Sequence, residues 1–175
     1  MIDLVPFTAA DADRLRGWIA SPEELRLWTA SSFGFPLTRE HLLGHLRESA
    51  ERGDRLIFKA VESGGGGEAV GHVELGAIDP RNRSLRIGRV LIDPARRGQG
   101  LGAAMMRAAL AKAFGELGMH RVELGVFDVN PRAIATYERV GFRRDGVRRE
   151  SFEVPGGYWS EVVMSVLAPE WEALT

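Results

Sequence analysis

Hydrophobic positions along the chain repeat with two spacings, and the changes between them predict an order of helices and strands. Apolar residues three and four positions apart, each group opened by a serine or threonine in a capping position, predict short helices over residues 8–19, 21–28 and 38–53. Alternating and β-branched runs predict strands over residues 2–7, 56–61, 69–77 and 84–92. Because short turns separate the last three strands, with a glycine-rich one at residues 64–67, we expect antiparallel pairing.

The second half of the chain predicts two longer helices with a strand between them. Residues 103–117 carry apolar side chains at helical spacing, and a second helix opens at its cap Asn130 and ends by Gly141. The compact apolar run at residues 122–126 is typical of a buried parallel strand. Two further runs predict a closing antiparallel hairpin, at residues 143–154 and 158–167. With no internal repeat, the pattern predicts one α/β domain over residues 1–175.

Composition narrows the class of protein. The 175 residues carry a formal net charge of −1, no cysteine and four histidines without metal-ligand spacing, so we expect no disulfide and no metal site. The basic run near residues 143–149 is interrupted by acids, which favours a solvated face over nucleic-acid binding. No apolar run approaches the roughly 20 residues that span a membrane. We therefore expect a cytoplasmic protein, and the sequence leaves a homodimer open.

A glycine-rich loop joins the strand at residues 84–92 to the following helix. Asp93-Pro94 ends the strand, and Arg96 and Arg97 precede three glycines at positions 98, 100 and 102. Free N–H groups and the helix dipole favour an anion at a helix N-terminus, and glycines let a phosphate approach the main chain. The loop therefore predicts a phosphate-binding site.

Two kinds of phosphate loop compare poorly with this one. Gly102-Ala103-Ala104 lacks the Gly-Lys-Ser/Thr ending of a nucleoside triphosphate-binding loop. Gly98, Gly100 and Ala103 match a dinucleotide fingerprint, with Asp128 as a candidate ribose ligand. The loop of this chain, however, is long and basic, and it begins too late in the chain for a doubly wound sheet. A nucleotide-binding oxidoreductase is therefore the weaker alternative.

Two motifs together resemble the GNAT superfamily of acyl-CoA-dependent N-acetyltransferases. The first is Arg97-x-x-Gly100-x-Gly102, and the second is Asn-x-x-Ala-x-x-x-Tyr-x-x-x-Gly-Phe from Asn130 to Phe142. The resemblance is tight over residues 90–142. It implies a GNAT-like mixed sheet with antiparallel N-terminal strands, a central βα pyrophosphate-loop unit and a C-terminal antiparallel hairpin. It also implies transfer of an acetyl group from acetyl-CoA to a primary amine, by direct attack in a ternary complex.

The same resemblance supplies the residues expected to bind acetyl-CoA. A splay or bulge would expose the backbone of the strand before the loop, and that backbone is expected to hold the pantetheine arm. Asn130 is either a helix cap alone or a cap that also touches this arm. The expected set is Val90, Leu91, Ile92, Arg97, Gly98, Gln99, Gly100, Leu101, Gly102 and Asn130. A non-catalytic acyl-CoA-binding module stays open as an alternative.

Catalytic residues are less well marked. By resemblance Tyr137 is the acid near the departing sulfur, although a tyrosine at this spacing could simply fill the core. Glu74 is the expected general base, with His72, Glu161 or water as substitutes. An aromatic segment before the second strand is expected to form a wall of the acceptor pocket or to anchor the core, and comprises Trp28, Phe33, Phe35 and His41. The acceptor itself, which could be a protein N-terminus, a polyamine or another small amine, is not specified.

Overall fold

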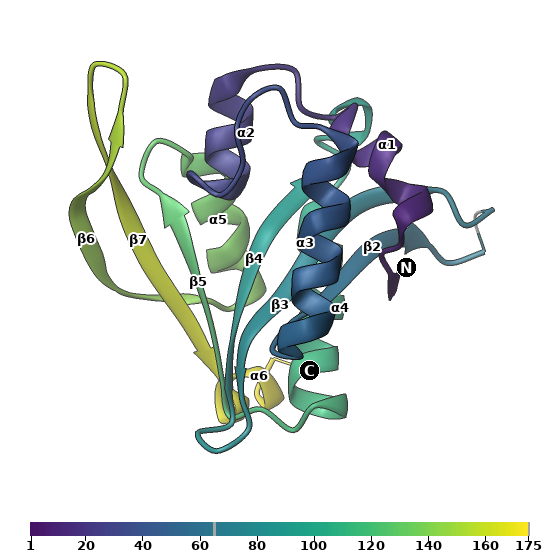
Figure 1. Cartoon of the computed structure of the whole chain (residues 1–175). Helices are drawn as coiled ribbons and strands as arrows, with labels where there is room; N and C mark the ends of the chain where they lie inside the picture. Colours follow the sequence, from purple (N-terminus) through teal and green to yellow (C-terminus); the bar gives the residue numbers. More distant parts are fainter. Residues whose placement is uncertain (65, 175) are drawn as a thin grey trace.

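Seven strands form one twisted sheet in the computed structural model, which describes residues 1–64 and 66–174. The order across the sheet is β1-β2-β3-β4-β5-β7-β6, and β4–β5 is the parallel pair among otherwise antiparallel neighbours (Figure 1). The strands are β1 Ile2–Pro6, β2 Leu56–Glu62, β3 Ala69–Asp79, β4 Ser84–Ile92, β5 Arg121–Phe127, β6 Arg143–Val154 and β7 Gly157–Leu167. This arrangement confirms the predicted mixed sheet with its antiparallel start and C-terminal hairpin.

Helices cover the two faces of the sheet. In Figure 1, α3 crosses the near face, whereas α4 and α5 lie behind the strands. The α-helices are α1 Ala12–Arg16, α2 Pro22–Thr29, α3 Arg39–Arg52, α4 Leu101–Ala111, α5 Pro131–Val140 and α6 Ala168–Glu172. Short 3-10 turns lie at Ala9–Asp11 and Pro94–Arg96, and a π-helical turn, Lys112–Glu116, extends α4. Within the described ranges, no helix has both the length and the apolar character needed to cross a membrane.

Most helix ends follow the predicted capping residues. The side chains of Ser21, Thr38 and Asn130 accept hydrogen bonds from the first turns of α2, α3 and α5, and Gly53 and Gly141 end two of these helices with a left-handed backbone. Other boundaries differ from the prediction. The first helix ends at Arg16, α4 begins two residues earlier than expected, and α6 was not predicted. Of the turn predicted at residues 64–67, Gly65 lies outside the described residues.

Two hydrophobic cores lie on opposite faces of the sheet. The larger one packs the sheet against α4 and α5, and its fully buried side chains include Val73, Leu75, Leu85, Ile87, Met105, Met106, Leu110, Val122, Leu124 and Met164. The smaller one lies beneath α1, α2 and α3 and comprises Phe7, Ala12, Leu15, Trp18, Ile19, Leu25, Trp28, Leu37, Leu42, Ile57 and Ala69. Because these three short helices cover only the first strands, the second face of β5, β6 and β7 stays more open.

Two strands differ in burial from their predicted patterns. On β3 both faces are buried, so His72 and Glu74 are as inaccessible as Val73 and Leu75. On β5 only alternate residues enter the larger core, and Glu123 and its neighbours on that face are half-buried. The prediction of a fully buried β5 was therefore wrong, because none of the helices in the described residues covers its second face.

Strand β3 lies against α4 at Gly71, with no room for a side chain. A Cβ added there would lie 2.8 Å from Sδ of Met105 and 3.0 Å from the backbone oxygen of Leu91. We expect Gly71→Ala to lower the free energy of unfolding by about 1–3 kcal/mol, measured by chemical denaturation, because well-packed interiors resist an added methyl group. The matched control is Gly88→Ala, whose added Cβ meets nothing within 4 Å, and its change should stay within about 0.5 kcal/mol. Equal effects in both variants would contradict this account of the packing.

Candidate active site

Strand β4 separates from β5 halfway along its length. Their parallel ladder runs from Ser84–Arg121 to Ile87–Leu124 and ends there, while pairing with β3 continues to Ile92. One extra residue is inserted in β4 where His72 pairs with Leu91 but Glu74 pairs with Gly88, and Arg89 at this bulge has a φ of +46°. The expected splay and bulge are thus both present. They leave the edge of residues 88–92 that faces β5 outside the ladder.

Buried side chains of β3 clamp this bulge. The Glu74 carboxylate accepts hydrogen bonds from Nη1 of Arg89 and Nη1 of Arg55, both at 2.7 Å, and lies 2.9 Å from Nε2 of His45. His72 holds the bulge from the backbone side, because its Nδ1 lies 2.9 Å from the carbonyl oxygen of Arg89 and must donate to it. A left-handed backbone is costly for arginine, so these contacts stabilise a conformation that the strand would not adopt alone.

The contacts within this clamp determine the protonation states of Glu74 and His72. Burial by itself would raise the pKa of Glu74, but the hydrogen bond from His45 and the charge of Arg89 outweigh burial and lower it to about 2. Burial lowers the pKa of His72, against the opposing charge of Glu74, which favours the neutral imidazole. A carboxylate with so low a pKa and three polar partners is a weak proton acceptor. The geometry therefore favours an anchoring role for Glu74 over the general-base role expected from the sequence.

The glycine loop follows directly and turns the chain into α4. Gly98 and Gly100 have φ values of +82° and +78°, and Gly100 is the residue before the first helical position. The Asp93 side chain accepts from the backbone N–H of Ala95 at 3.0 Å and pairs with Arg14, which fixes the start of the loop. Free N–H groups of the first α4 turn therefore face the end of the splay, as an anion site requires.

The first turns of α5 form the opposite wall. Asn130 caps this helix by accepting from the backbone N–H of Ala133 at 3.2 Å. Tyr137 lies two turns on, with its ring 6.0 Å from that of Phe142 and its side chain almost entirely buried. Burial raises the pKa of Tyr137, so the hydroxyl keeps its proton at neutral pH.

These parts surround one cleft of about 1440 Å³. Its lining includes the bulged strand, the loop, the start of α4 and one face of α5. Of the residues predicted from the sequence, the cleft brings together Glu74, Val90, Leu91, Ile92, Arg97, Gly98, Gly100, Leu101, Gly102, Asn130, Tyr137 and Glu161. Gln99 is not among the lining residues, and its Oε1 instead accepts from Nε of Arg96 at 3.0 Å. The glycine pattern of the loop motif could not show which side chains of the loop contact the loop itself instead of the cleft.

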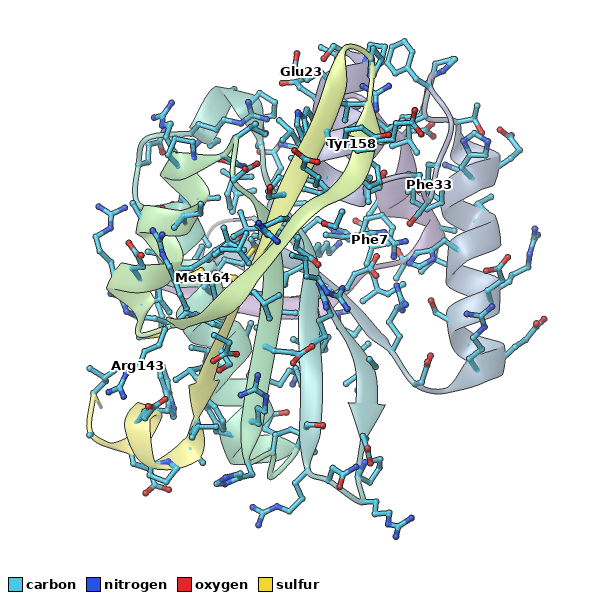
Figure 2. All side chains as sticks on the ribbon, turned by 90° about the vertical axis from the view of Figure 1, so that its left-hand side faces the viewer. Phe7, Glu23, Phe33, Arg143, Tyr158 and Met164 are labelled. Carbon is cyan, nitrogen blue, oxygen red and sulfur yellow. The ribbon has the colours of Figure 1, made fainter. Side chains whose placement is uncertain are left out.

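The aromatic residues expected at the acceptor wall divide into three groups. Trp28 is buried, lines the cleft and packs edge-on to His72. Phe33 and His41 stack at 6.0 Å and line a smaller neighbouring pocket with α3, and Figure 2 shows Phe33 on this side of the molecule. Phe35 is about half exposed and lines neither space. The core-anchor interpretation therefore holds for Trp28, and the acceptor-wall interpretation of this segment stays a prediction.

Sequence reasoning missed several residues of the cleft. Arg132 and Arg139 of α5 line it beside Asn130, and Arg55 and Arg86 line its far end. The α5 arginines were detectable in principle, because positions 132 and 139 lie within the motif that carries Asn130 and Tyr137. Arg55 precedes a strand and carries no local signal, since only the pairing of β2 with β3 brings it to Glu74. Among the described residues, no cluster of histidines and acids could hold a metal ion.

Comparison with known proteins decides the family. The family model described as Acetyltransferase (GNAT) family matches residues 18–142, which is more than half of the chain. The chain belongs to the GNAT acetyltransferase family. It is therefore an acyl-CoA-dependent N-acetyltransferase, as the two sequence motifs predicted.

Individual relatives of this GNAT chain differ in name. It is similar to a spermidine N(1)-acetyltransferase of Vibrio cholerae, with 29% identity over 127 residues that cover 73% of this chain and 69% of that one. It is also similar to a mycothiol acetyltransferase of Salinispora tropica, with 44% identity over 70 residues, or 38% of this chain and 23% of that protein. A crystal structure of the Vibrio cholerae spermidine N-acetyltransferase in complex with CoA and spermine superposes with a TM-score of 0.84 at 22% identity, covering 98% of each chain.

The phosphate loop of this GNAT chain can be tested with two left-handed glycines. Gly100→Ala should lower the affinity for acetyl-CoA by at least tenfold, about 1.4 kcal/mol, because the methyl group stands where a diphosphate would approach. Gly53→Ala is the control, since Gly53 has a similar φ of +66° at the end of α3 and also has open space around it. Both should destabilise the fold by about 1 kcal/mol, and only Gly100→Ala should weaken binding in calorimetric titration. Equal affinities would remove the loop from the site.

The clamp predicts a pH dependence of stability. The pKa of Glu74 falls from an ordinary 4.5 to about 2 on folding, so its charge contributes about 3 kcal/mol of stability above pH 4.5. That contribution should disappear as the pH falls from 4.5 towards 2, and Glu74→Gln should abolish this part of the profile. The half-exposed Glu123→Gln is the control and should change stability by under about 1 kcal/mol.

Turnover of Glu74→Gln separates the two roles of this carboxylate. If Glu74 anchors the bulge, its replacement should lower acetyl-CoA affinity and turnover alike at every pH. Rescue of turnover at high pH with unchanged affinity would instead restore the general-base role.

Proposed function

We propose that this GNAT chain transfers the acetyl group of acetyl-CoA directly to a primary amine, with both substrates in the cleft at once. The observation that carries the proposal is the end of the β4–β5 ladder at Ile87, directly before the glycine loop. It provides an exposed strand edge for an extended, amide-bearing arm beside a helix N-terminus for its diphosphate.

The residues present fit acetyl-CoA on three counts. Left-handed Gly98 and Gly100 leave open space above the main chain, where no neighbouring atom would touch an added Cβ. The α4 N-terminus supplies positive potential, and the guanidinium groups of Arg96 and Arg97, which are paired with Glu62 and Glu24, lie beside it. The bulged backbone of residues 90–92 has donors and acceptors for the amides of the pantetheine arm. Asn130 lies in the same wall, so capping α5 and touching this arm are compatible roles for it.

Acetyl-CoA supplies an already activated thioester, so the protein mainly has to position and polarise. In the proposed reaction, backbone N–H groups of the bulged strand donate to the acyl oxygen as negative charge develops there. The Tyr137 hydroxyl, kept protonated by burial, donates to the sulfur as it departs. This help exists only while the C–S bond breaks, so it lowers the barrier and contributes little to binding.

Removal of the amine's proton is the step for which the cleft provides the fewest suitable side chains. Glu161, the substitute base, is paired with Arg86 and with Arg148, and Glu74 is held by Arg55 and Arg89. The lowered pKa of Glu74 makes it a poor base, and Glu161 would have to give up a guanidinium contact to receive the proton. This supports proton loss to water, or attack by the fraction of amine that is already neutral.

The acceptor is the finer part of the proposal. The relatives' printed names include spermidine and mycothiol acetyltransferases, so the names alone support an amine acceptor without fixing its structure. Spermidine is the first acceptor to assay, because the Vibrio cholerae enzyme aligns over most of the chain. A non-catalytic acyl-CoA-binding module predicts binding of acetyl-CoA with no CoA release from any amine.

Replacement of Tyr137 by phenylalanine tests the proposed function. Tyr137→Phe retains the ring and nearly all its packing, so we expect turnover to fall about ten- to a thousandfold while acetyl-CoA affinity changes only a few fold. Tyr158→Phe is a matched control, because Tyr158 is exposed and lies near the tip of the β6–β7 hairpin (Figure 2). Turnover, affinity and melting temperature should be measured on the same preparations. A lower melting temperature with normal turnover would show a tyrosine that only fills the core.

A further inference from the structure

The charges of the cleft are unevenly exposed at the end away from the glycine loop. We define the acceptor end as Arg55, Glu74, Arg86, Gly88, Arg89 and Glu161, which line the cleft around the open second face of the sheet. Its carboxylates are covered, with side chains 3% exposed at Glu74 and 18% at Glu161. The side chains of Arg55 and Arg86 are more accessible, at 26% and 35% exposed, while that of Arg89 is 14% exposed. A ligand entering this end therefore meets arginines first.

Every glutamate that lines the cleft already has an arginine partner. Glu74 and Glu161 each have two, while Glu24 pairs with Arg97 and Glu138 pairs with Arg144. A polyamine carries several ammonium groups, and each would need a carboxylate that is not already neutralised. The charge distribution is therefore poorly suited to a polycation.

Unpaired hydrogen-bonding groups around this end are donors. Three buried side-chain atoms in the described part of the protein lack a partner: Nε1 of Trp28 and Nε of Arg89, whose residues line the cleft, and Oδ1 of Asp54, whose residue does not. Buried donors without partners destabilise a fold, so they favour a ligand or water that brings oxygen acceptors. The excess of guanidinium groups and the two unsatisfied donors lead separately to the same kind of ligand.

Glycines give this end a floor without side chains. Arg55 lies over Gly76, whose added Cβ would be 3.4 Å from Nε of Arg55, and the Arg86–Glu161 ion pair lies over Gly125. Between them Gly88 is open, with no atom within 4 Å of an added Cβ. A small planar group can thus lie on the Gly88 backbone beside guanidinium groups, which bind carboxylates through paired N–H donors.

We propose that the preferred acceptor is an amine that also carries a carboxylate, which the acceptor end binds through Arg86 and Arg55. The inference rests on the proposed acetyl transfer and specifies its substrate class. Recognition of the carboxylate places the amine towards Val90–Ile92, where the strand edge is exposed.

A matched set of acceptors tests this directly. The set is pentylamine, 5-aminopentanoate and 1,5-diaminopentane, which share the reacting amine and differ in a neutral, anionic or cationic far end. Homologues with two to four carbons in the chain cover other distances, and spermidine is included. We expect kcat/KM for the best aminocarboxylate to exceed that of the diamine of equal length by at least tenfold. Equal or better use of diamines or spermidine would overturn the inference and leave the acetyltransferase function standing.

Variants then assign the preference to the arginines. The double variant Arg86→Gln with Glu161→Gln removes both charges of one ion pair, so the net charge is unchanged, and it should reduce the preference at least fivefold through the acceptor KM. The control double variant, Arg121→Gln with Asp145→Asn, removes another ion pair of the sheet, at 2.7 Å, whose residues do not line the cleft. Its preference should equal that of the unmodified protein.

Remaining outcomes are also decisive. If the Arg86 double variant does not fold, as judged by its melting curve, Arg55→Gln takes its place, because Glu74 then keeps Arg89 and His45. A preference that survives removal of either arginine would overturn their role in binding the carboxylate. Binding of acetyl-CoA without acetylation of any amine in the set or of spermidine would overturn the proposed function itself, and this inference with it.

Discussion

A carboxylate almost without solvent contact lies in the sheet at Glu74, and a buried charge is stable only when cations and donors surround it. Its partners come from three separate segments: His45 from α3, Arg55 from the residue before β2, and Arg89 from β4. Holding Arg89 in this position requires a left-handed backbone and an extra residue in β4. The electrostatic requirement of one buried group therefore coincides with the place where the strand bulges.

The consequence of the bulge is geometric. Once β4 turns away from β5 after Ile87, the sheet cannot close, and the opening between the strands becomes the cleft. The helices on the far side complete it, because α4 presents its N-terminus and α5 presents Asn130 and Tyr137. Catalysis by positioning suits such a site, since the same rigid elements that open the sheet also hold the donors in place.

The two ends of the cleft follow different physical rules. The loop end uses main-chain N–H groups and a helix dipole, which suit an anion and depend little on side-chain identity. The acceptor end is built from side chains on β2, β3, β4 and β7 and from their ion pairs. The fold, which a solved GNAT structure shares at 22% identity, therefore does not determine the side chains of the acceptor end.

Local sequence determined the parts of the fold whose interactions are local. The capping roles of Ser21, Thr38 and Asn130 and the left-handed turns at Gly53 and Gly141 were predictable, because each concerns residues a few positions apart. The early start of α4 was not predictable, because its N-cap residue, Gly100, has no side chain that could cap the helix. Only the carbonyl oxygen of Gly100 accepts a hydrogen bond from the first turn. The half-open β5 was also missed, because an apolar run does not reveal whether a helix covers its second face.

By itself, the sequence determined the family, the order of the strands along the chain and most of the residues that line the loop end of the cleft. Those signals are two short motifs, in which the glycines and the Asn130 cap set the local backbone conformation, while Arg97 and Tyr137 contribute side chains to the cleft. Only the tertiary structure decided that Glu74 is a clamp with a depressed pKa and that Arg55, Arg86 and Arg89 meet at one end of the cleft. Ion pairs between residues 15 to 75 positions apart depend on strand register and on burial, and neither is encoded in any local pattern.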